Sequence, residues 1–160
     1  MTYNEKEVIK MDNKTLILMM GIQGSGKSTF CQKFLTEYKR INLDTLKTRH
    51  REQMAVEECF GNGESFVVDN TNPTKADRER YITQAKNRGY KVVGYFMESK
   101  IKECILRNNE RTGRACVPAK AIAATSNKLQ LPSYDEGFEE LYFVINNGVE
   151  MTIEKWGENK

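Results

Sequence analysis

The residues with the clearest chemical signature form one short run near the start of the chain. Residues 21–28, Gly-Ile-Gln-Gly-Ser-Gly-Lys-Ser, match the pattern G-x-x-x-x-G-K-[ST], with an apolar strand-length segment before them and a helix-length segment after. Glycines let backbone N–H groups close around phosphates, the lysine neutralises the β- and γ-phosphates, and the serine hydroxyl ligates Mg²⁺. The run predicts a nucleoside triphosphate site with contacts from Gly21, Gln23, Gly24, Ser25, Gly26, Lys27, Ser28 and Thr29.

An aspartate marks the side where a phosphate acceptor would bind. Asp44 follows the second apolar segment, and the carboxyl ends of parallel strands meet at one edge of a sheet, so we expect it beside the phosphate loop. Transfer to an alcohol needs a base that orients the hydroxyl and takes its proton. Asp44 is the candidate general base; the alternative is that it only caps the next helix.

The helix expected after Asp44 has an unusual order of charges. Its first two turns carry Lys47, Arg49, His50 and Arg51, and its last turn carries Glu57 and Glu58. This order opposes the helix dipole at both ends, which indicates an external anion near the helix start. Lys47 is therefore a candidate acceptor contact. The alternative is an exposed face on which Glu52 offsets the arginines.

A third polar cluster follows residues 66–68. Asp69 lies where Walker B carboxylates lie, and three roles are open for it: binding Mg²⁺ through water, contacting the acceptor, or forming an ion pair with Lys47. Asn72 is a candidate acceptor contact. For Asn70 and Asn72, turn or cap roles are the alternative.

Arginines gather in the second half of the chain. Arg107 and Arg111 have i, i+4 spacing, and Arg114 follows Thr112-Gly113. Guanidinium groups stabilise the charge that spreads over a transferring phosphoryl group, so we predict catalytic roles for Arg111 and Arg107 and an acceptor contact for Arg114. Gly113 would be the hinge of a closing lid. Arg107 has an alternative role in an ion pair with Glu103.

The segments that must position these residues alternate between strand length and helix length. Strands are expected at residues 16–20, 41–43, 66–68, 91–97 and about 141–145, and helices at 29–38, 45–60, 73–87, 100–111 and 117–129. Proline would take the first position of the third helix. The alternation predicts an α/β fold with a five-stranded parallel sheet flanked by helices, as in P-loop NTPases, and a C-terminal lid that carries the arginines. A chain of 160 residues predicts one domain, residues 15–160, after an extension at 1–14.

Composition narrows the class of protein. The chain is 39% apolar and 29% charged, which is typical of a globular protein, and its longest apolar run, residues 16–20, is too short to cross a bilayer. With no signal segment at the N-terminus, we expect a cytoplasmic protein without a membrane partner. The four cysteines, Cys31, Cys59, Cys104 and Cys116, are expected to be reduced core residues. A net charge of +3 does not by itself predict nucleic-acid binding.

Taken together, these motifs resemble those of a known family. The chain is similar, over about residues 16–144, to the 5′-kinase domain of polynucleotide kinases, through segments at 24–30, 41–46, 68–73, 107–111, 117–118 and 136–138. The resemblance implies ATP-dependent phosphorylation of a 5′-hydroxyl end of DNA or RNA. It also implies Asp44 as base, Lys27 and Arg111 as transition-state clamps, and Asp69 and Lys47 at the acceptor site. Many members have arginine where this chain has Leu43, and others have arginine where this chain has Lys47. The lysine keeps the positive charge but cannot form the paired hydrogen bonds that arginine forms with a phosphate.

Two other functions compete with this one. A kinase for a small metabolite, nucleoside or sugar nucleotide would share the loop, the base and the arginines. A GTPase-like switch is disfavoured, because residues 127–130, Asn-Lys-Leu-Gln, lack the carboxylate that reads guanine and residues 69–72 lack the glycine of D-x-x-G. We therefore expect ATP as the phosphate donor. No second catalytic aspartate motif occurs, so we expect a kinase without a phosphatase; the oligomeric state is not predicted.

Overall fold

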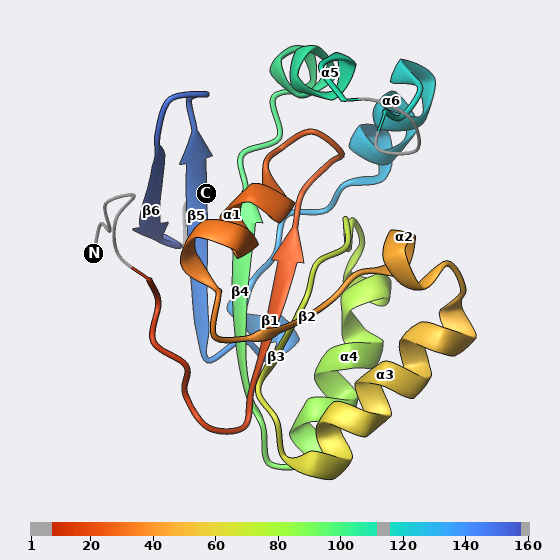
Figure 1. Cartoon of the computed structure of the whole chain (residues 1–160). Coiled ribbons are helices and arrows are strands. Elements are labelled where there is room, and N and C mark those ends of the chain that lie inside the picture. Colours follow the sequence, from red (N-terminus) through yellow and green to blue (C-terminus); the bar gives the residue numbers. More distant parts are fainter. Residues whose placement is uncertain (1–7, 112–115, 158–160) are drawn as a thin grey trace.

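The arrangement of the chain is given by a computed structural model that describes residues 8–111 and 116–157. Its centre is a six-stranded sheet (Figure 1). The strands are β1 (Thr15–Met20), β2 (Lys39–Ile41), β3 (Phe66–Val68), β4 (Lys91–Met97), β5 (Glu140–Asn146) and β6 (Met151–Lys155). Their spatial order is β2-β3-β1-β4-β5-β6.

The first five strands confirm the predicted parallel sheet. β1 lies at its centre and pairs in parallel with β3 and β4. The sixth strand, β6, was not predicted, and it pairs with β5 in antiparallel fashion. Asn147-Gly148 between the two strands is a common hairpin turn signal, so the sequence did contain a marker for this strand.

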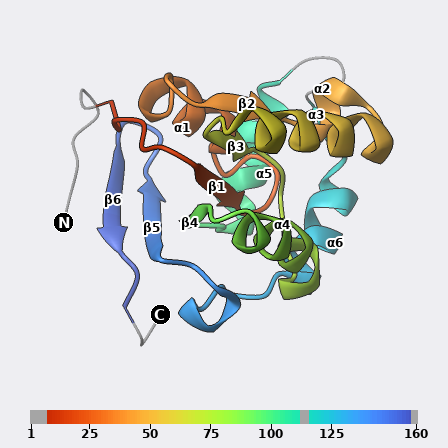
Figure 2. The same cartoon turned by 90° about the horizontal axis from the view of Figure 1, so that it is seen from below.

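Helices cover both faces of the sheet, as Figure 2 shows along the strands. They are α1 (Lys27–Phe34), α2 (Leu43–Leu46), α3 (Arg49–Asn62), α4 (Lys75–Asn87), α5 (Ile101–Asn109) and α6 (Ala119–Lys128). Side chains alternate across β1: Leu16 and Leu18 join one buried cluster with α3 and α4, whereas Ile17 and Met19 join another with α1. This alternation is what makes a two-sided core.

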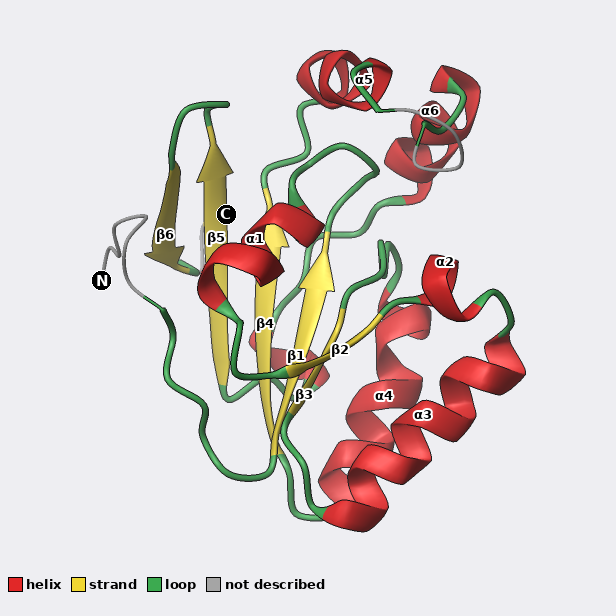
Figure 3. Ribbon diagram, viewed as in Figure 1, coloured by secondary structure: helices red, strands yellow, loops and turns green. Residues whose placement is uncertain are grey.

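Helices α5 and α6 lie beyond the carboxyl ends of the strands (Figure 3). Ile22 of the phosphate loop, Cys104 of α5 and Ile122 of α6 form a small buried cluster of their own. Packing therefore ties both helices to the loop that follows β1.

The predicted helix over residues 45–60 is wrong in one respect, because two helices occupy this region. Lys47 has a left-handed backbone, with φ of 74°, and ends α2. Thr48 then caps α3 by accepting a hydrogen bond from the Arg51 N–H. Lys47 therefore lies at a helix C-terminus, where its charge is favourable, so it is not one of the charges that oppose a helix dipole.

Two smaller expectations also need correction. Helix α4 begins at Lys75 after a capping box formed by Thr74 and Asp77, so Pro73 precedes the helix. Cys31, Cys59 and Cys104 are buried free thiols as expected, but Cys116 is exposed. In the described ranges, every helix is too short or too polar to span a bilayer.

Candidate active site

A cleft of about 760 Å³ opens at the carboxyl edge of the sheet. The phosphate loop and α1 border one side, and the residues that follow β2 and β3 border the other. Among the predicted site residues, its lining includes Gln23, Gly24, Lys27, Ser28, Thr29, Asp44, Asp69, Asn72 and Arg111. The cleft thus brings together predicted site residues from four separate parts of the chain.

The glycines of the phosphate loop are required by close packing. Gly24 has φ of 80°, and a Cβ there would lie 2.2 Å from the Cys104 carbonyl oxygen in α5. Gly26 has φ of 101°, and a Cβ there would lie 2.5 Å from Asn146 Nδ2 at the end of β5. Any larger residue would strain the backbone and collide with these neighbours, so the loop keeps its shape only with glycine.

The N-terminus of α1 is arranged to receive an anion. Gly26 caps this helix without any side-chain hydrogen bond, which leaves the first-turn N–H groups to other partners. Ser25 Oγ is buried and has no hydrogen-bond partner among the described residues. Free donors at a helix start and a buried hydroxyl fit the phosphates of a nucleotide.

Lys27 is almost completely buried at the base of this loop. Its Nζ donates hydrogen bonds of 2.9 Å to the carbonyl oxygens of Gly21 and Ile22. Burial lowers the pKa of Lys27 from 10.5 to about 8; the charge of Asp69 acts in the opposite direction, and that of Arg111 lowers it further. Phosphates near the ammonium would favour its charged form.

Ser28 and Asp69 form a pair of oxygen ligands at the cleft floor. Ser28 Oγ donates to Asp69 Oδ2 at 3.0 Å, and the carboxylate is 1% exposed. A hydroxyl and a carboxylate are ligands that suit Mg²⁺, which takes further ligands from water and substrate phosphates. The described residues hold no cluster of three or more His, Cys, Asp or Glu side chains suited to a metal, and a nucleotide-dependent Mg²⁺ site needs none.

An arginine that the sequence did not reveal bridges this pair. Arg40 Nε donates to Asp69 Oδ2 at 2.7 Å, and Arg40 Nη2 donates to Ser28 Oγ at 3.0 Å. Of the three roles left open for Asp69, the ion pair is therefore formed with Arg40 and not with Lys47. β2 ends at Ile41, two residues earlier than predicted, which is why Arg40 lies at the cleft edge.

Asp44 lies in the first turn of α2, and its exposed side chain borders the cleft. Asn42 is the residue that caps α2, since its Oδ1 accepts a 3.1 Å hydrogen bond from the Thr45 N–H. The alternative that Asp44 is the cap is therefore wrong. Within the described part of the chain, hydrogen bonds and ion pairs do not engage its carboxylate, so it can accept a proton from a bound hydroxyl.

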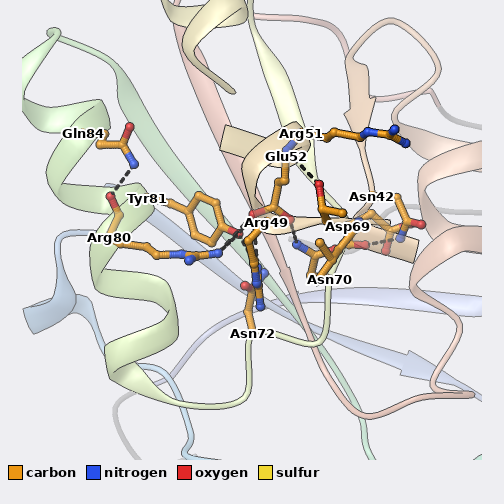
Figure 4. A network of polar contacts seen from close by, with 12 residues as sticks. Asn42, Arg49, Arg51, Glu52, Asp69, Asn70, Asn72, Arg80, Tyr81 and Gln84 are labelled. Carbon is orange, nitrogen blue, oxygen red and sulfur yellow. Dashed lines mark hydrogen bonds and ion pairs between the residues drawn. The ribbon is translucent and has the colours of Figure 1, made fainter. Parts of the chain in front are cut away.

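A polar network holds the start of α2 against the end of β3 (Figure 4). Asn70 Oδ1 accepts a 2.9 Å hydrogen bond from the Leu43 N–H, and Asn70 Nδ2 donates to Glu52 Oε2 at 2.8 Å. Asn42 Nδ2 donates to the Asp69 carbonyl oxygen. These contacts fix the position of the turn that carries Asp44.

Two predicted acceptor contacts have other surroundings. Lys47 is exposed at the corner between α2 and α3 and is not among the described residues that line the cleft. Asn72 is buried, with φ of 42°, and its Nδ2 donates a 2.8 Å hydrogen bond to the Met19 carbonyl oxygen. Its amide therefore holds the turn after β3 to the end of β1.

The predicted arginine cluster separates into different environments. Arg111 lines the cleft and is close enough to Lys27 to affect its pKa. Arg107 Nη1 donates to the Gly24 carbonyl oxygen at 3.0 Å, and its Nη2 lies 3.5 Å from Glu103 Oε2. Arg107 thus holds the phosphate loop from behind, and its ion pair with Glu103 is present. Arg114 and the proposed hinge Gly113 lie outside the described residues.

Glu52 is the second residue that sequence reasoning missed. It was interpreted as a partner of surface arginines, yet it is 2% exposed. A signal was present, because Glu52, Val56 and Cys59 share one helical face and the latter two are core residues. A carboxylate on the apolar face of a helix needs buried partners, and the structure supplies them.

Comparison with known proteins finds sequences similar to this chain, although no family model matches it. It is 29% identical over 159 residues to a bifunctional polynucleotide phosphatase/kinase of Schizosaccharomyces pombe, covering 93% of this chain and 38% of that protein. It is 32% identical over 140 residues to a putative protein of the same description from Acanthamoeba polyphaga mimivirus, covering 82% of this chain and 33% of that protein. The chain is a relative of the polynucleotide phosphatase/kinases.

The resemblance predicted from the motifs is thereby confirmed for most of the chain. The chain spans about a third of the length of those two proteins. Its fold is also that of a gluconokinase from Sinorhizobium meliloti 1021, with a TM-score of 0.56 and 18% identity over 84% of each chain. The α/β fold is therefore shared beyond proteins with similar sequences.

Proposed function

We propose that this chain is an ATP-dependent kinase that transfers the γ-phosphoryl group to a 5′-hydroxyl end of DNA or RNA. The observation that carries the proposal is the two-sided cleft. Lys27, Ser28 and Arg111 border it together with Asp44, whose carboxylate has no hydrogen-bond or ion-pair partner among the residues that the structure describes. The names of the two relatives support the choice of a polynucleotide as acceptor.

The phosphate loop supplies the donor half of the reaction. Backbone N–H groups at the start of α1 bind the β- and γ-phosphates, and Lys27 and Arg111 neutralise charge that spreads over the γ-phosphoryl oxygens during transfer. Ser28, together with Asp69, would hold a nucleotide-bound Mg²⁺, which would supply further charge neutralisation on the phosphates. Arg107 contributes by fixing the backbone of Gly24.

Asp44 supplies the acceptor half. It orients the 5′-hydroxyl by accepting its hydrogen bond, and the hydroxyl oxygen attacks the γ-phosphorus in line with the bond to the β–γ bridging oxygen. That bond breaks, ADP leaves with the electron pair, and the hydroxyl proton passes to Asp44. The products are ADP and a 5′-phosphorylated end.

The remaining acceptor contacts are proposals of the same kind. Lys47 would contact acceptor phosphates outside the cleft through its positive charge. Arg114 would also contact the acceptor, because it follows Arg107 and Arg111 in the arginine cluster. Asn72 supports the acceptor side through the turn that it holds, and Asp69 borders both halves.

Phosphate transfer to defined acceptors tests the function. The purified chain is incubated with γ-labelled ATP and Mg²⁺, with DNA and RNA oligonucleotides that have a free 5′-hydroxyl, and with nucleosides and sugars, including gluconate. We expect label on the oligonucleotides, and none on matched oligonucleotides that already have a 5′-phosphate. Label only on a small molecule would favour the metabolite kinase, and ATP hydrolysis without transfer would also reject the proposal.

A further inference from the structure

Two arginines line the cleft without belonging to the donor half. Arg49 is the first residue of α3 and Arg80 lies in α4, so two different helices bring them to the same wall. Both bind one carboxylate oxygen: Arg49 Nη1 and Arg80 Nη2 each lie 3.1 Å from Glu52 Oε1. Figure 4 shows them converging on Glu52 with Tyr81.

Glu52 has the features of a positioning residue. Its carboxylate is buried and also accepts hydrogen bonds from the Tyr81 hydroxyl and from Asn70 Nδ2. A buried carboxylate with several donors is held in one orientation, so it fixes both guanidinium groups. Two arginines against one glutamate leave one positive charge in excess at the cleft wall.

The arginines themselves remain accessible. The side chains of Arg49 and Arg80 are 54% and 44% exposed. The hydrogen bonds within the described part of the chain use only one terminal nitrogen of each, whereas a guanidinium has five N–H donors. The remaining donors suit a phosphate, which accepts paired hydrogen bonds from arginine.

The same network reaches the proposed base. Asn70 binds Glu52 through its amide nitrogen and the Leu43 N–H through its oxygen, and Leu43 directly precedes Asp44. An anion bound by the two arginines is therefore on the acceptor side of the cleft, away from Lys27, whose buried ammonium points into the phosphate loop.

We propose that Arg49 and Arg80 form a subsite for a backbone phosphate of the acceptor strand, 3′ to its reacting 5′-hydroxyl, with Glu52 as their positioning residue. The inference rests on the proposed function and deepens it, because such a subsite selects a polynucleotide over a nucleoside or sugar. If the arginines only satisfied the buried Glu52, their loss would change stability but not the response to charge on the acceptor.

Binding of charged and neutral acceptors separates these roles. DNA and RNA tetranucleotides with a free 5′-hydroxyl and a 3′-fluorophore are made with phosphodiester linkages or with uncharged methylphosphonate linkages. Affinity is measured by fluorescence anisotropy over a range of salt concentrations for the wild type, Arg49→Gln and Arg80→Gln. Arg51→Gln is the matched control, because Arg51 is exposed on the same helix and outside the described lining of the cleft.

We expect each cleft variant to bind the phosphodiester about tenfold more weakly, with the salt slope reduced by about 0.7 for a lost phosphate contact. Binding of the methylphosphonate should change by less than about twofold in the same variants, because this acceptor has no backbone charge for the arginines to contact. Arg51→Gln should match the wild type. Equal losses for both acceptors, or an equal loss in Arg51→Gln, would overturn the subsite.

Transfer assays on the same acceptors distinguish the two proposals. If the wild type phosphorylates the tetranucleotides but the variants show no charge-dependent loss, the subsite fails and the kinase stands. If charge-dependent binding through Arg49 and Arg80 is present but no acceptor is phosphorylated, the kinase fails, and the two arginines bind a nucleic-acid phosphate without a reacting hydroxyl beside it. Arg49→Lys and Arg80→Lys replace the glutamine variants if thermal melting shows that those do not fold. They keep the charge but lose the paired donors, so they should bind the phosphodiester more weakly with an unchanged salt slope, and wild-type affinity in both would overturn the subsite.

Discussion

Ser28 Oγ donates a 3.0 Å hydrogen bond to Asp69 Oδ2, joining residues that are 41 positions apart. The first turn of α1 and the end of β3 thus meet at one carboxylate, where a nucleotide-bound cation would be held. Arg40 contacts both members of the pair, so a guanidinium charge already lies at the oxygens that suit Mg²⁺.

Arg40→Gln should lower the Mg²⁺ concentration needed for nucleotide binding. The guanidinium and Mg²⁺ compete for the same oxygens, and removal of a like charge at this partly exposed position is worth about 1 kcal/mol, or roughly a fivefold change. The half-maximal Mg²⁺ concentration is measured by titration of ATP-analogue binding. Lys39→Gln, an exposed neighbour in β2, is the control. An unchanged or higher requirement in Arg40→Gln would contradict the competition.

Asp44→Asn should lower the rate of phosphoryl transfer by ~10²–10⁴ while ATP affinity stays the same. The amide keeps the shape of the side chain but cannot accept the hydroxyl proton, and this range is typical of a lost general base. Single-turnover transfer and equilibrium ATP binding are measured in parallel. Asp135→Asn, at an exposed position of the 3₁₀ helix Tyr134–Glu136, should behave as the wild type. Normal turnover in Asp44→Asn would remove Asp44 from the reaction.

ATP affinity should fall as the pH rises above about 8. Lys27 has a lowered pKa of about 8 in the free protein, because its ammonium is buried, and nucleotide phosphates bind the protonated form. Affinity should therefore decrease towards tenfold per pH unit above this value, and binding near pH 8 to 9 should take up a proton. Calorimetry in buffers of different ionisation enthalpy measures both.

Lys27→Met provides the control for this pH dependence, since its weaker binding should not show the loss above pH 8. Folding stability has the opposite sign. The unfolded chain holds this proton up to about 10.5, so between pH 8 and 10.5 the contribution of Lys27 to stability rises with pH. Wild-type ATP affinity that is flat from pH 7 to 9.5 would contradict the buried ammonium.

Glu52→Ala should destabilise the fold by about 2–4 kcal/mol. The change removes a buried carboxylate and leaves two arginines, Tyr81 and Asn70 without their shared partner. Urea unfolding measures the loss. Glu58→Ala, at an exposed position on the same helix, should change stability by less than about 0.5 kcal/mol. Equal effects of the two substitutions would mean that the Glu52 network contributes nothing.

Local patterns in the sequence determined the donor half of this site. The glycines, Lys27 and Ser28 are neighbours in the chain, between β1 and the first turn of α1, so their spacing alone was enough to recognise the phosphate loop. The bounds of β3 and β4 were also predicted correctly, because continuous apolar runs bounded by turn residues are typical of buried parallel strands. Asp44 was placed at the cleft by the rule that carboxyl ends of parallel strands share one edge, whereas Arg111 was predicted from the arginine cluster that follows the fourth strand.

Only the tertiary structure decided what each polar residue contacts. Arg40 reaches Asp69, 29 positions away, from an edge strand. Glu52 joins α3 to Tyr81 of α4, also 29 positions away, and to Asn70 after β3. The left-handed turn at Lys47 that separates α2 from α3 was likewise hidden, because helix propensity is similar on both sides of it. Hydrogen-bond partners distant in sequence are chosen by how strands and helices pack. The sequence therefore determines which polar side chains are present, and the packing of strands and helices determines which of them come into contact.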